Sequence, residues 1–344
     1  MRMVRARPSR LPVTWLLGIG AVALMAVVIG IAVGPASLSV PDILGAFGER
    51  WLGIEASPGL SQSQTAILWE IRLPRVVLGM LVGGGLAASG AAYQGVFRNP
   101  LADPFLLGVA AGAGLGATIG IVFDLNRSLV PLLAFVGALA GVGAAYFLGY
   151  SLRTGRSTGA LLLAGVAVAA FLTATQTYLQ QLNADALREV YAWILGRLTT
   201  TGWHEVRLAL PYLAVGIAVL VAYRRTLDVL ALGDEEATSL GVNVNQVRTI
   251  VIAAATLVTA SAVAVSGLIA FVGIIVPHIL RLVVGTSYRR LIPLSILAGG
   301  AFLVLADVMA RSVQQPAELP IGVITAFIGA PFFVLVLRTA GRTT

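Results

Sequence analysis

The chain has 344 residues, of which 58% are hydrophobic and 11% charged, with a mean hydropathy of +0.92 and a formal net charge of +8. Repeated apolar stretches of about 18 or more residues exclude a soluble globular domain and predict a polytopic helical membrane protein. Cysteine is absent, which excludes disulfides and thiolate metal sites, and two histidines, His204 and His278, are too far apart in sequence to indicate a metal site.

Ten apolar windows predict ten membrane-spanning helices. They cover residues 12–34, 76–95, 105–123, 129–152, 159–180, 208–223, 248–266, 268–286, 292–310 and 320–337. The seventh and eighth windows form one apolar run. We divide this run at Ser266-Gly267, because a single helix of that length would exceed the ~30 Å hydrocarbon core.

An even number of spans places both ends of the chain on the same side of the membrane. That side carries 15 of the 23 basic residues, and the positive-inside rule therefore predicts that both termini are cytoplasmic. Residues 1–11 would form a basic cytoplasmic tail. The apolar run that follows is interpreted as a retained first span, since no A-x-A-like cleavage site of a secretory signal follows it.

All 23 basic residues are arginines, because the sequence contains no lysine. A P-loop of the form G-x-x-x-x-G-K-[ST] needs a lysine to reach the nucleotide phosphates, so this chain cannot carry that ATP site. Any such ATP hydrolysis must occur in a partner. The predicted topology gives a net charge of about +10 on the cytoplasmic side and about −2 outside. This distribution indicates ordinary membrane topology rather than nucleic-acid binding.

Three successive acids interrupt the apolar pattern in "ALGDEEATSLGVN", residues 231–243. Asp234, Glu235 and Glu236 suit the first turn of a short helix, where the helix dipole favours anions. Gly241 suits the C-terminal stop of that helix, and Ala237 with Leu240 would give it one apolar face. A solvated loop that carries a run of charges is the alternative.

Two stretches match in spacing, since Gly90 precedes Pro100 by ten residues and Gly267 precedes Pro277 by ten. The predicted spans that carry them run in opposite directions, which is typical of inverted-repeat transporters, so the pattern predicts two five-span halves. Chance similarity of two glycine-rich stretches is the alternative.

Glycines recur at every fourth position of the third predicted span. Such a stripe lets helix backbones approach closely where lipid provides no hydrophobic drive for association. We expect it to pack against another helix of this chain, with a dimer interface as the alternative. The stripe consists of Gly108, Gly112, Gly116 and Gly120.

A set of motifs runs in order from about residue 70 to the C-terminus. It comprises "IRLPRVVLGMLVGGGLAASGAAYQGVFRNPLADPFLLGVAAGAG", "LLLAGVAVAA", "WILGRL", "VSGLIAFVGIIVPHILRLVVG", "LADVMAR" and "AELPIGVITAFIGAPFFVLVL". Together these motifs resemble the FecCD-type permeases, the membrane subunits of type II ABC importers for vitamin B12, haem and ferric siderophores.

The resemblance implies an all-α fold of ten transmembrane helices, arranged as two inverted five-helix halves within a single transmembrane domain covering residues 1–344. It also implies a second permease subunit, in a homodimer or a heterodimer, and an extracytoplasmic substrate-binding protein. Two cytoplasmic ATPase subunits would bind ATP and Mg, and this chain would have no cofactor, no metal site and no catalytic residue. The expected location is a bacterial plasma membrane, in contact with membrane lipid.

Within that family the cytoplasmic segment between spans 6 and 7, here residues 224–248, forms short helices that seat in the ATPase subunit. The resemblance therefore assigns ATPase coupling to the acidic segment, through Asp234, Glu235, Glu236, Ala237, Leu240 and Gly241.

Family binding proteins present acidic residues to permease arginines. The motif positions assign this docking role to Arg72, Arg75 and Arg311, which the predicted topology puts at extracellular ends of spans. The alternatives are interfacial snorkelling and a local pair between Arg311 and Asp307, four residues earlier on the same helix.

The resemblance places a cytoplasmic gate where the fifth span begins, at Ser157 and Thr158, although these hydroxyls would equally suit a helix N-cap. The polar outer end of that span is assigned to the translocation path, with a polar interfacial helix end as the alternative. The path candidates are Gln176, Tyr178, Gln180 and Gln181.

Two other classes of protein compete with an importer. A proton- or sodium-driven transporter would need ionisable residues at depth, and Asp307 is the one acid near a predicted span interior. A membrane enzyme would need paired carboxylates, a nucleophile with its base or a metal cluster, none of which the sequence indicates. For cargo we rank ferric siderophore first, then cobalamin, then haem.

Overall fold

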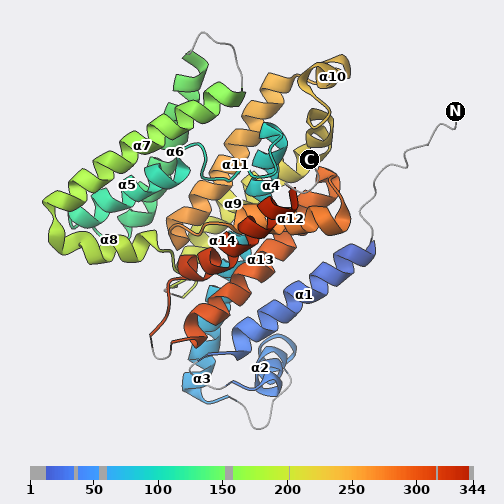
Figure 1. Cartoon of the computed structure of the whole chain (residues 1–344). Helices are drawn as coiled ribbons and strands as arrows, with labels where there is room; N and C mark the ends of the chain where they lie inside the picture. The colour runs from blue at the N-terminus through green and yellow to red at the C-terminus, as the bar shows by residue number, and fades with distance from the viewer. Residues whose placement is uncertain are drawn as a thin grey trace.

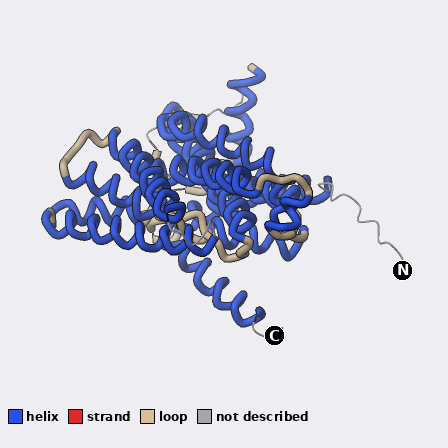
Figure 2. The backbone as a smooth tube through the Cα atoms, turned by 90° about the horizontal axis from the view of Figure 1, so that it is seen from above, coloured by secondary structure: helices blue, strands red, loops and turns tan. Residues whose placement is uncertain are grey.

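A computed structural model of the chain describes residues 13–34, 38–53, 60–151, 158–200, 202–314 and 317–340. Within these ranges the backbone forms helices, turns and loops without a strand (Figure 1, Figure 2). The elements are α1 (Val13–Ala32), α2 (Val40–Leu52), α3 (Gln62–Ala66), a π-helical turn (Ile67–Arg72), α4 (Leu73–Phe97), α5 (Val109–Val122), α6 (Leu129–Ser151), α7 (Thr158–Leu182), a 3₁₀ turn (Ala184–Ala186), α8 (Leu187–Ile194), α9 (His204–Leu230), α10 (Asp234–Ser239), α11 (Val244–Ser266), α12 (Val272–Val284), α13 (Tyr288–Ser312) and α14 (Ile321–Ala340).

Each of the ten predicted windows overlaps one helix of the described chain. Seven segments are long and apolar enough to cross a membrane, and they contain α1, α4, α6, α7, α9, α11 and α13. Helices α5, α12 and α14 carry shorter apolar stretches. The polytopic helical class is therefore confirmed, whereas ten crossings stay a prediction.

The predicted division of the long apolar run is confirmed. Helix α11 ends at Ser266, and Gly267 follows with a φ of +68°, a conformation that glycine adopts without strain. The short elements α2, α3 and α8 were not expected, because none is long enough to produce an apolar window.

Helix α4 lies at the centre of the bundle. Every residue from Val82 to Phe97 is buried, so no side of this stretch faces solvent or lipid. Its neighbours are α13, α11, α9 and α12. A helix that is apolar and small on all sides can be enclosed in this way, and α4 consists largely of glycine, alanine, valine and leucine.

Glycines allow the neighbours of α4 to approach its backbone. A Cβ atom added to Gly83 would collide with the carbonyl oxygen of Gly299 in α13, and one added to Gly90 would collide with that of Gly273 in α12. The side chain of Gln94, one turn further along α4, donates to the same Gly273 carbonyl at 3.1 Å. Backbone contact of this kind leaves no space for a larger residue.

The glycine stripe of α5 packs against α6, as expected for packing within one chain. A Cβ atom on Gly112 would meet the carbonyl oxygen of Gly137, and one on Gly116 would meet that of Leu133. The intramolecular interpretation of the stripe is therefore confirmed.

Three segments that are distant in sequence cross beside the break between α11 and α12. The Arg197 amide donates to the Ser266 carbonyl at 2.7 Å, and the amides of Ile321 and Gly322 donate to Gly196 and Leu195 at 3.1 Å. This junction explains why the motifs "WILGRL", "VSGL" and "LPIG" each contain a glycine.

The spacing match between the two halves does not hold as a structural equivalence. Gly90 lies inside α4 whereas Gly267 follows the end of α11, and Pro100 follows α4 whereas Pro277 lies inside α12. The equal spacing therefore pairs positions that occupy different places in their helices.

Replacing Gly90 by alanine is expected to separate α4 from α12. Overpacking of a close contact costs about 1–3 kcal/mol, so the Gly90→Ala protein should unfold at a lower temperature in detergent, as monitored by fluorescence-detected size exclusion after heating. Gly18→Ala in α1 is the control, since its added Cβ meets no atom within 4 Å. Equal unfolding temperatures for the two variants would contradict this packing.

Candidate functional site

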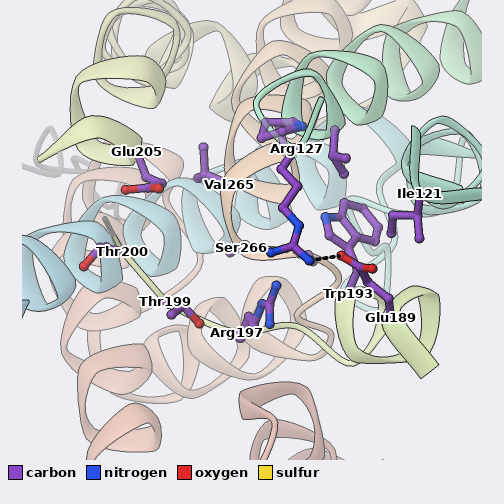
Figure 3. Close-up of a pocket in the computed structure, with 14 residues that line it drawn as sticks. Ile121, Arg127, Glu189, Trp193, Arg197, Thr199, Thr200, Glu205, Val265 and Ser266 are labelled. Atoms are coloured by element: carbon purple, nitrogen blue, oxygen red, sulfur yellow. Dashed lines mark hydrogen bonds and ion pairs between the residues drawn. The ribbon is translucent and has the colours of Figure 1, made fainter. Parts of the chain in front are cut away.

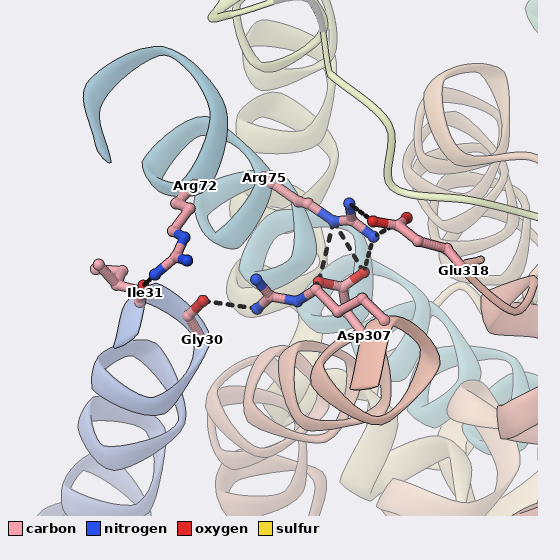
Figure 4. Close-up of polar contacts among 7 residues, drawn as sticks. Gly30, Ile31, Arg72, Arg75, Asp307 and Glu318 are labelled. Atoms are coloured by element: carbon pink, nitrogen blue, oxygen red, sulfur yellow. Dashed lines mark hydrogen bonds and ion pairs between the residues drawn. The ribbon is translucent and has the colours of Figure 1, made fainter. Parts of the chain in front are cut away.

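A cluster of charged side chains joins the start of α4, the end of α13 and the link before α14 (Figure 4). The Arg75 guanidinium donates to both carboxylate oxygens of Asp307 at 2.8–3.1 Å and to both oxygens of Glu318 at 2.9 and 3.0 Å. Arg311 Nε lies 3.3 Å from Asp307 Oδ2, one turn away on α13. These four residues, together with Arg72, are termed the arginine cluster.

Arg72 and Arg311 hold the C-terminal end of α1. Arg72 Nη1 donates to the carbonyls of Ile31 and Ala32 at 2.7 and 2.9 Å, and Arg311 Nη2 donates to that of Gly30 at 2.6 Å. The last carbonyls of a helix lack partners within the helix, and the helix dipole favours cations there. The two arginines therefore cap α1 and attach it to α4 and α13.

Exposure distinguishes the members of the cluster. The side chains of Asp307 and Arg311 are each 4% exposed and that of Arg75 is 13% exposed, whereas the Glu318 side chain is 47% exposed. Hydrogen bonds from Arg75 hold the pKa of the Glu318 carboxyl below its usual value, so Glu318 stays charged near neutral pH. Glu318 is the most accessible part of the cluster.

The three arginines expected to dock a binding protein thus lie together at one end of the bundle. Their guanidinium groups are also bound within the chain, and the local pair between Asp307 and Arg311 is present. The docking role stays a prediction. It would involve the accessible side of Arg75, beside Glu318.

The acidic segment forms a second charged site, at the opposite end of α4. Arg98, directly after α4, lies 3.3 Å from Asp234 at the start of α10, and Arg248 of α11 lies 3.2 Å from the same carboxylate. Figure 1 shows α10 at the end of the bundle away from α2 and α3. Asp234 therefore fastens α10 to two core helices.

Helix α10 has most of the local form predicted from sequence. Its first turn contains Asp234, Glu235 and Glu236, and Gly241 follows its end with a φ of +83°. The expected single apolar face does not form. Ala237 is fully buried against the bundle, whereas Leu240, which follows the last residue of α10, is 63% exposed.

The outward side of α10 offers charge and an apolar group together. Glu235 and Glu236 are exposed, as is Leu240, and Leu232 just before the helix is exposed as well. Such a combination suits a protein partner better than water alone, since exposed leucines at two ends of an acidic turn gain by being covered.

Helix α4 connects the two charged sites directly. Arg75 lies in its first turn and Arg98 follows its last, and the 25 residues of α4 span about 37 Å at 1.5 Å per residue. A change at one site can therefore reach the other through a single buried helix.

A cavity of about 400 Å³ lies where α5, α6, α8 and α11 meet (Figure 3). Arg127 approaches Glu189 to 3.7 Å across it, with Arg197, Glu205 and the Trp193 ring also on its walls. Paired charges and an aromatic wall can hold a polar ligand by ion pairs, hydrogen bonds and stacking. The described residues contain no group of three or more histidine, cysteine, aspartate or glutamate side chains able to hold a metal ion.

The four path candidates on α7 separate into two pairs. Gln176 and Gln180 are each 8% exposed, and Gln176 packs against Gly114 of α5. Tyr178 and Gln181 are exposed on the opposite side of α7, and the path role of all four residues stays a prediction.

The gate candidates fall at the edge of the described chain. Ser157 lies outside the described residues. Thr158 is the first residue of α7, and its side chain is not described, so the gate stays a prediction.

Sequence patterns missed Glu318 and the cavity residues. Glu318 is 243 positions from Arg75, and no periodicity connects residues so distant. Its place in the motif "AELPIG" was the available signal, since an acid two residues before the proline that precedes α14 is unusual beside an apolar segment.

The chain matches known proteins over most of its length. A family model described as the FecCD transport family matches residues 21–339. The cobalamin import system permease protein BtuC of Halobacterium salinarum is 44% identical over 323 residues, covering 91% of this chain and 86% of that protein. The hemin transport system permease protein HmuU of Yersinia pestis is 41% identical over 280 residues, covering 79% and 83%.

A solved structure also matches this chain over nearly its whole length. A structure described as an inward-facing metal-chelate type ABC transporter has a TM-score of 0.84 and 29% sequence identity, and the match covers 95% of this chain and 99% of that chain. The Fe(3+) dicitrate transport system permease protein FecD of Escherichia coli is 40% identical over 79% of this chain and 85% of its own length. This chain therefore belongs to the FecCD transport family.

Proposed function

We propose that the chain is the membrane-spanning permease subunit of an ATP-driven importer for a bulky metal chelate, which a substrate-binding protein delivers. The observation that carries the proposal is α10, a short acidic helix fastened to the bundle by Asp234 and exposing Glu235, Glu236 and Leu240. A chain without lysine needs a partner to supply a P-loop ATPase. Relatives named for cobalamin, hemin and ferric dicitrate transport support the cargo class.

Helix α10 would receive the motion of the ATPase. Its exposed side would seat in the ATPase subunit, and the ion pairs of Asp234 with Arg98 and Arg248 would pass a displacement to α4 and α11. The segment 224–248 would thus act as the coupling element. Alternating access would follow from movement of the helices attached to it.

The arginine cluster would receive the substrate-binding protein. Arg75 already holds two carboxylates, and this arrangement supports a role in binding acidic partners. An acidic side chain of the binding protein would bind Arg75 from the exposed side, where Glu318 lies.

The architecture we propose has ten crossing helices in two inverted halves, with both termini in the cytoplasm. Helix α4 packs on α13 as α11 packs on α6, and α5 packs on α6 as α12 packs on α13, which supports the pairing of halves. Exposed apolar side chains on α7 and α14, such as Phe171 and Phe327, support a second permease subunit across the path. Tyr178 and Gln181 would then line that path, with Ser157 and Thr158 at its cytoplasmic end.

An ion-driven transporter is the alternative, and the placement of Asp307 does not favour it. This acid, the candidate for a proton site, is bound by Arg75 and lies 3.3 Å from Arg311. Ion pairing with two guanidinium groups of the same chain accounts for this buried acid without a role in ion transport.

Transport should depend on ATP and not on an ion gradient. The purified complex, reconstituted in liposomes with ATP inside, is expected to take up ferric chelate supplied with its binding protein when ionophores have abolished all gradients. Uptake that persists without ATP and follows a proton or sodium gradient would refute the proposal.

Reversing the exposed charges of α10 should release the ATPase. The double variant Glu235→Arg with Glu236→Arg keeps Asp234 and its ion pairs intact. Like charges facing each other across an interface cost several kcal/mol, so co-purification of the ATPase subunit should fall by about tenfold or more. Glu49→Arg, an exposed acid at the C-terminal end of α2, is the matched control and should retain the ATPase. If the double variant still couples ATP hydrolysis fully to transport, α10 is not part of the interface with the ATPase subunit.

Removing the charge of Arg75 should weaken docking. Charge-assisted hydrogen bonds contribute about 1.5–3 kcal/mol, so Arg75→Gln should raise the Kd of the binding protein for proteoliposomes by about tenfold or more. Arg50→Gln is the control, because the Arg50 guanidinium lies over the Trp69 ring rather than on Asp307 or Glu318. Unfolding temperatures of both variants separate lost docking from lost stability, and an unchanged Kd in a folded Arg75→Gln protein would exclude Arg75 from the dock.

A further inference from the structure

Two cavities lie in line along one face of α6. The larger, about 490 Å³, lies between residues 139–150 of α6 and residues 249–256 of α11 and is termed the α6–α11 groove. The smaller, about 290 Å³, lies between the other end of α6, α9 and residues 261–265 of α11. Both are formed by helices that are long and apolar enough to cross a membrane.

The walls of the α6–α11 groove are apolar, and their hydroxyls are bonded within the chain. Tyr146 and Thr249 share a hydrogen bond across it, and Thr256 is paired with Tyr93 at 2.8 Å. Val142 and Ile252 form its buried floor, with 6% and 3% exposure. An occupant therefore needs no polar group at this depth.

We propose that the α6–α11 groove binds an acyl chain of a membrane phospholipid. Its walls extend over eleven steps of α6, about 16 Å at 1.5 Å per residue, which equals about half of the ~30 Å hydrocarbon core. An acyl chain fills one leaflet and ends at the midplane. A partner helix would instead run the whole thickness of the membrane.

The ends of the groove agree with this orientation. Tyr146 and Tyr150 lie at the end of α6, with ring centroids 5.0 Å apart, and aromatic rings of this kind are enriched at the level of lipid headgroups. The smaller cavity continues the same face of α6 toward its other end, as a second chain from the opposite leaflet would require. Lipid binding at this site requires only that the chain lies in a bilayer. It does not depend on which cargo is transported.

Shape also distinguishes a lipid from a second copy of the chain. Gly143 opens the groove wall, and a Cβ atom placed there meets nothing within 4 Å. A flexible acyl chain can fill such a hollow and gain its dispersion contacts. Because an acyl chain in the bilayer is already out of water, shape complementarity decides which lipids stay bound.

The site borders the start of α11. Thr249 on its wall directly follows Arg248, which binds Asp234 of α10. A bound acyl chain would therefore support the helical turn to which α10 is fastened.

The test fills the groove and counts the lipids that remain bound. The full chain is reconstituted in nanodiscs of phosphatidylethanolamine and phosphatidylglycerol at a molar ratio of about 3:1, transferred to mild detergent and weighed by native mass spectrometry. Gly143→Leu and Ala253→Leu each place a side chain in the groove from opposite walls. Gly18→Leu adds the same side chain to the exposed surface of α1, where nothing lies within 4 Å.

We expect each groove variant to lose at least one bound phospholipid per chain relative to the unsubstituted protein, and Gly18→Leu to lose none. Monodisperse elution of both groove variants shows that the loss does not follow from misfolding. Equal lipid counts in all proteins would overturn the proposal. A groove variant that keeps its lipids but changes from dimer to monomer would overturn it in favour of an interface between two copies of the chain.

Discussion

The close approach of α4 to its neighbours is the constraint on which the rest of the molecule depends. Glycines at positions 83 and 90 bring its backbone against the carbonyls of α13 and α12, and no residue between Val82 and Phe97 reaches the surface. In a bilayer this packing replaces the hydrophobic drive that assembles soluble cores. It fixes the positions of α13, α11, α9 and α12, and through α13 also that of α1. Motion that separated these helices would open voids along the whole contact, so α4 is suited to move as one rigid body with the charged groups at its two ends.

The charged groups at the two ends of α4 differ in burial and in what they hold. At one end, Arg75 and Arg311 surround the buried Asp307, and Arg72 with Arg311 closes the carbonyl end of α1. At the other end, one half-exposed aspartate fastens a short helix whose remaining acids point away from the bundle. The first arrangement holds α1, α4 and α13 together at the end of the bundle where we propose that a binding protein docks. The second attaches α10 through Asp234 and the buried Ala237 and leaves its other side free for a partner.

Sequence patterns located the long helices because backbone groups in a membrane must be paired within their own segment, so apolar length alone predicts a helix. They also located α10, where three acids and a following glycine mark both ends of a turn, and the pair of Asp307 with Arg311, which lies within one turn of helix. Contacts between segments that are distant in sequence could not be predicted from these patterns. Nothing local connects Glu318 with Arg75, or Gly196 with Ile321. The equal glycine-to-proline spacing was misleading because proline can follow a helix, as Pro100 does, or lie within one, as Pro277 does.

The half-exposed attachment of α10 makes the two ends of the molecule respond differently to their ionic surroundings. Arg98 and Asp234 are 43% and 46% exposed, whereas Asp307 and Arg311 are each 4% exposed. Dissolved ions screen charges that water reaches, over about 10 Å at 0.1 M salt and about 3 Å at 1 M, and act much less on buried pairs. Concentrated salt would therefore loosen the attachment of α10 while the framework around α1 stays closed, and a partner held by charge at α10 would be released before the contacts around α1 change.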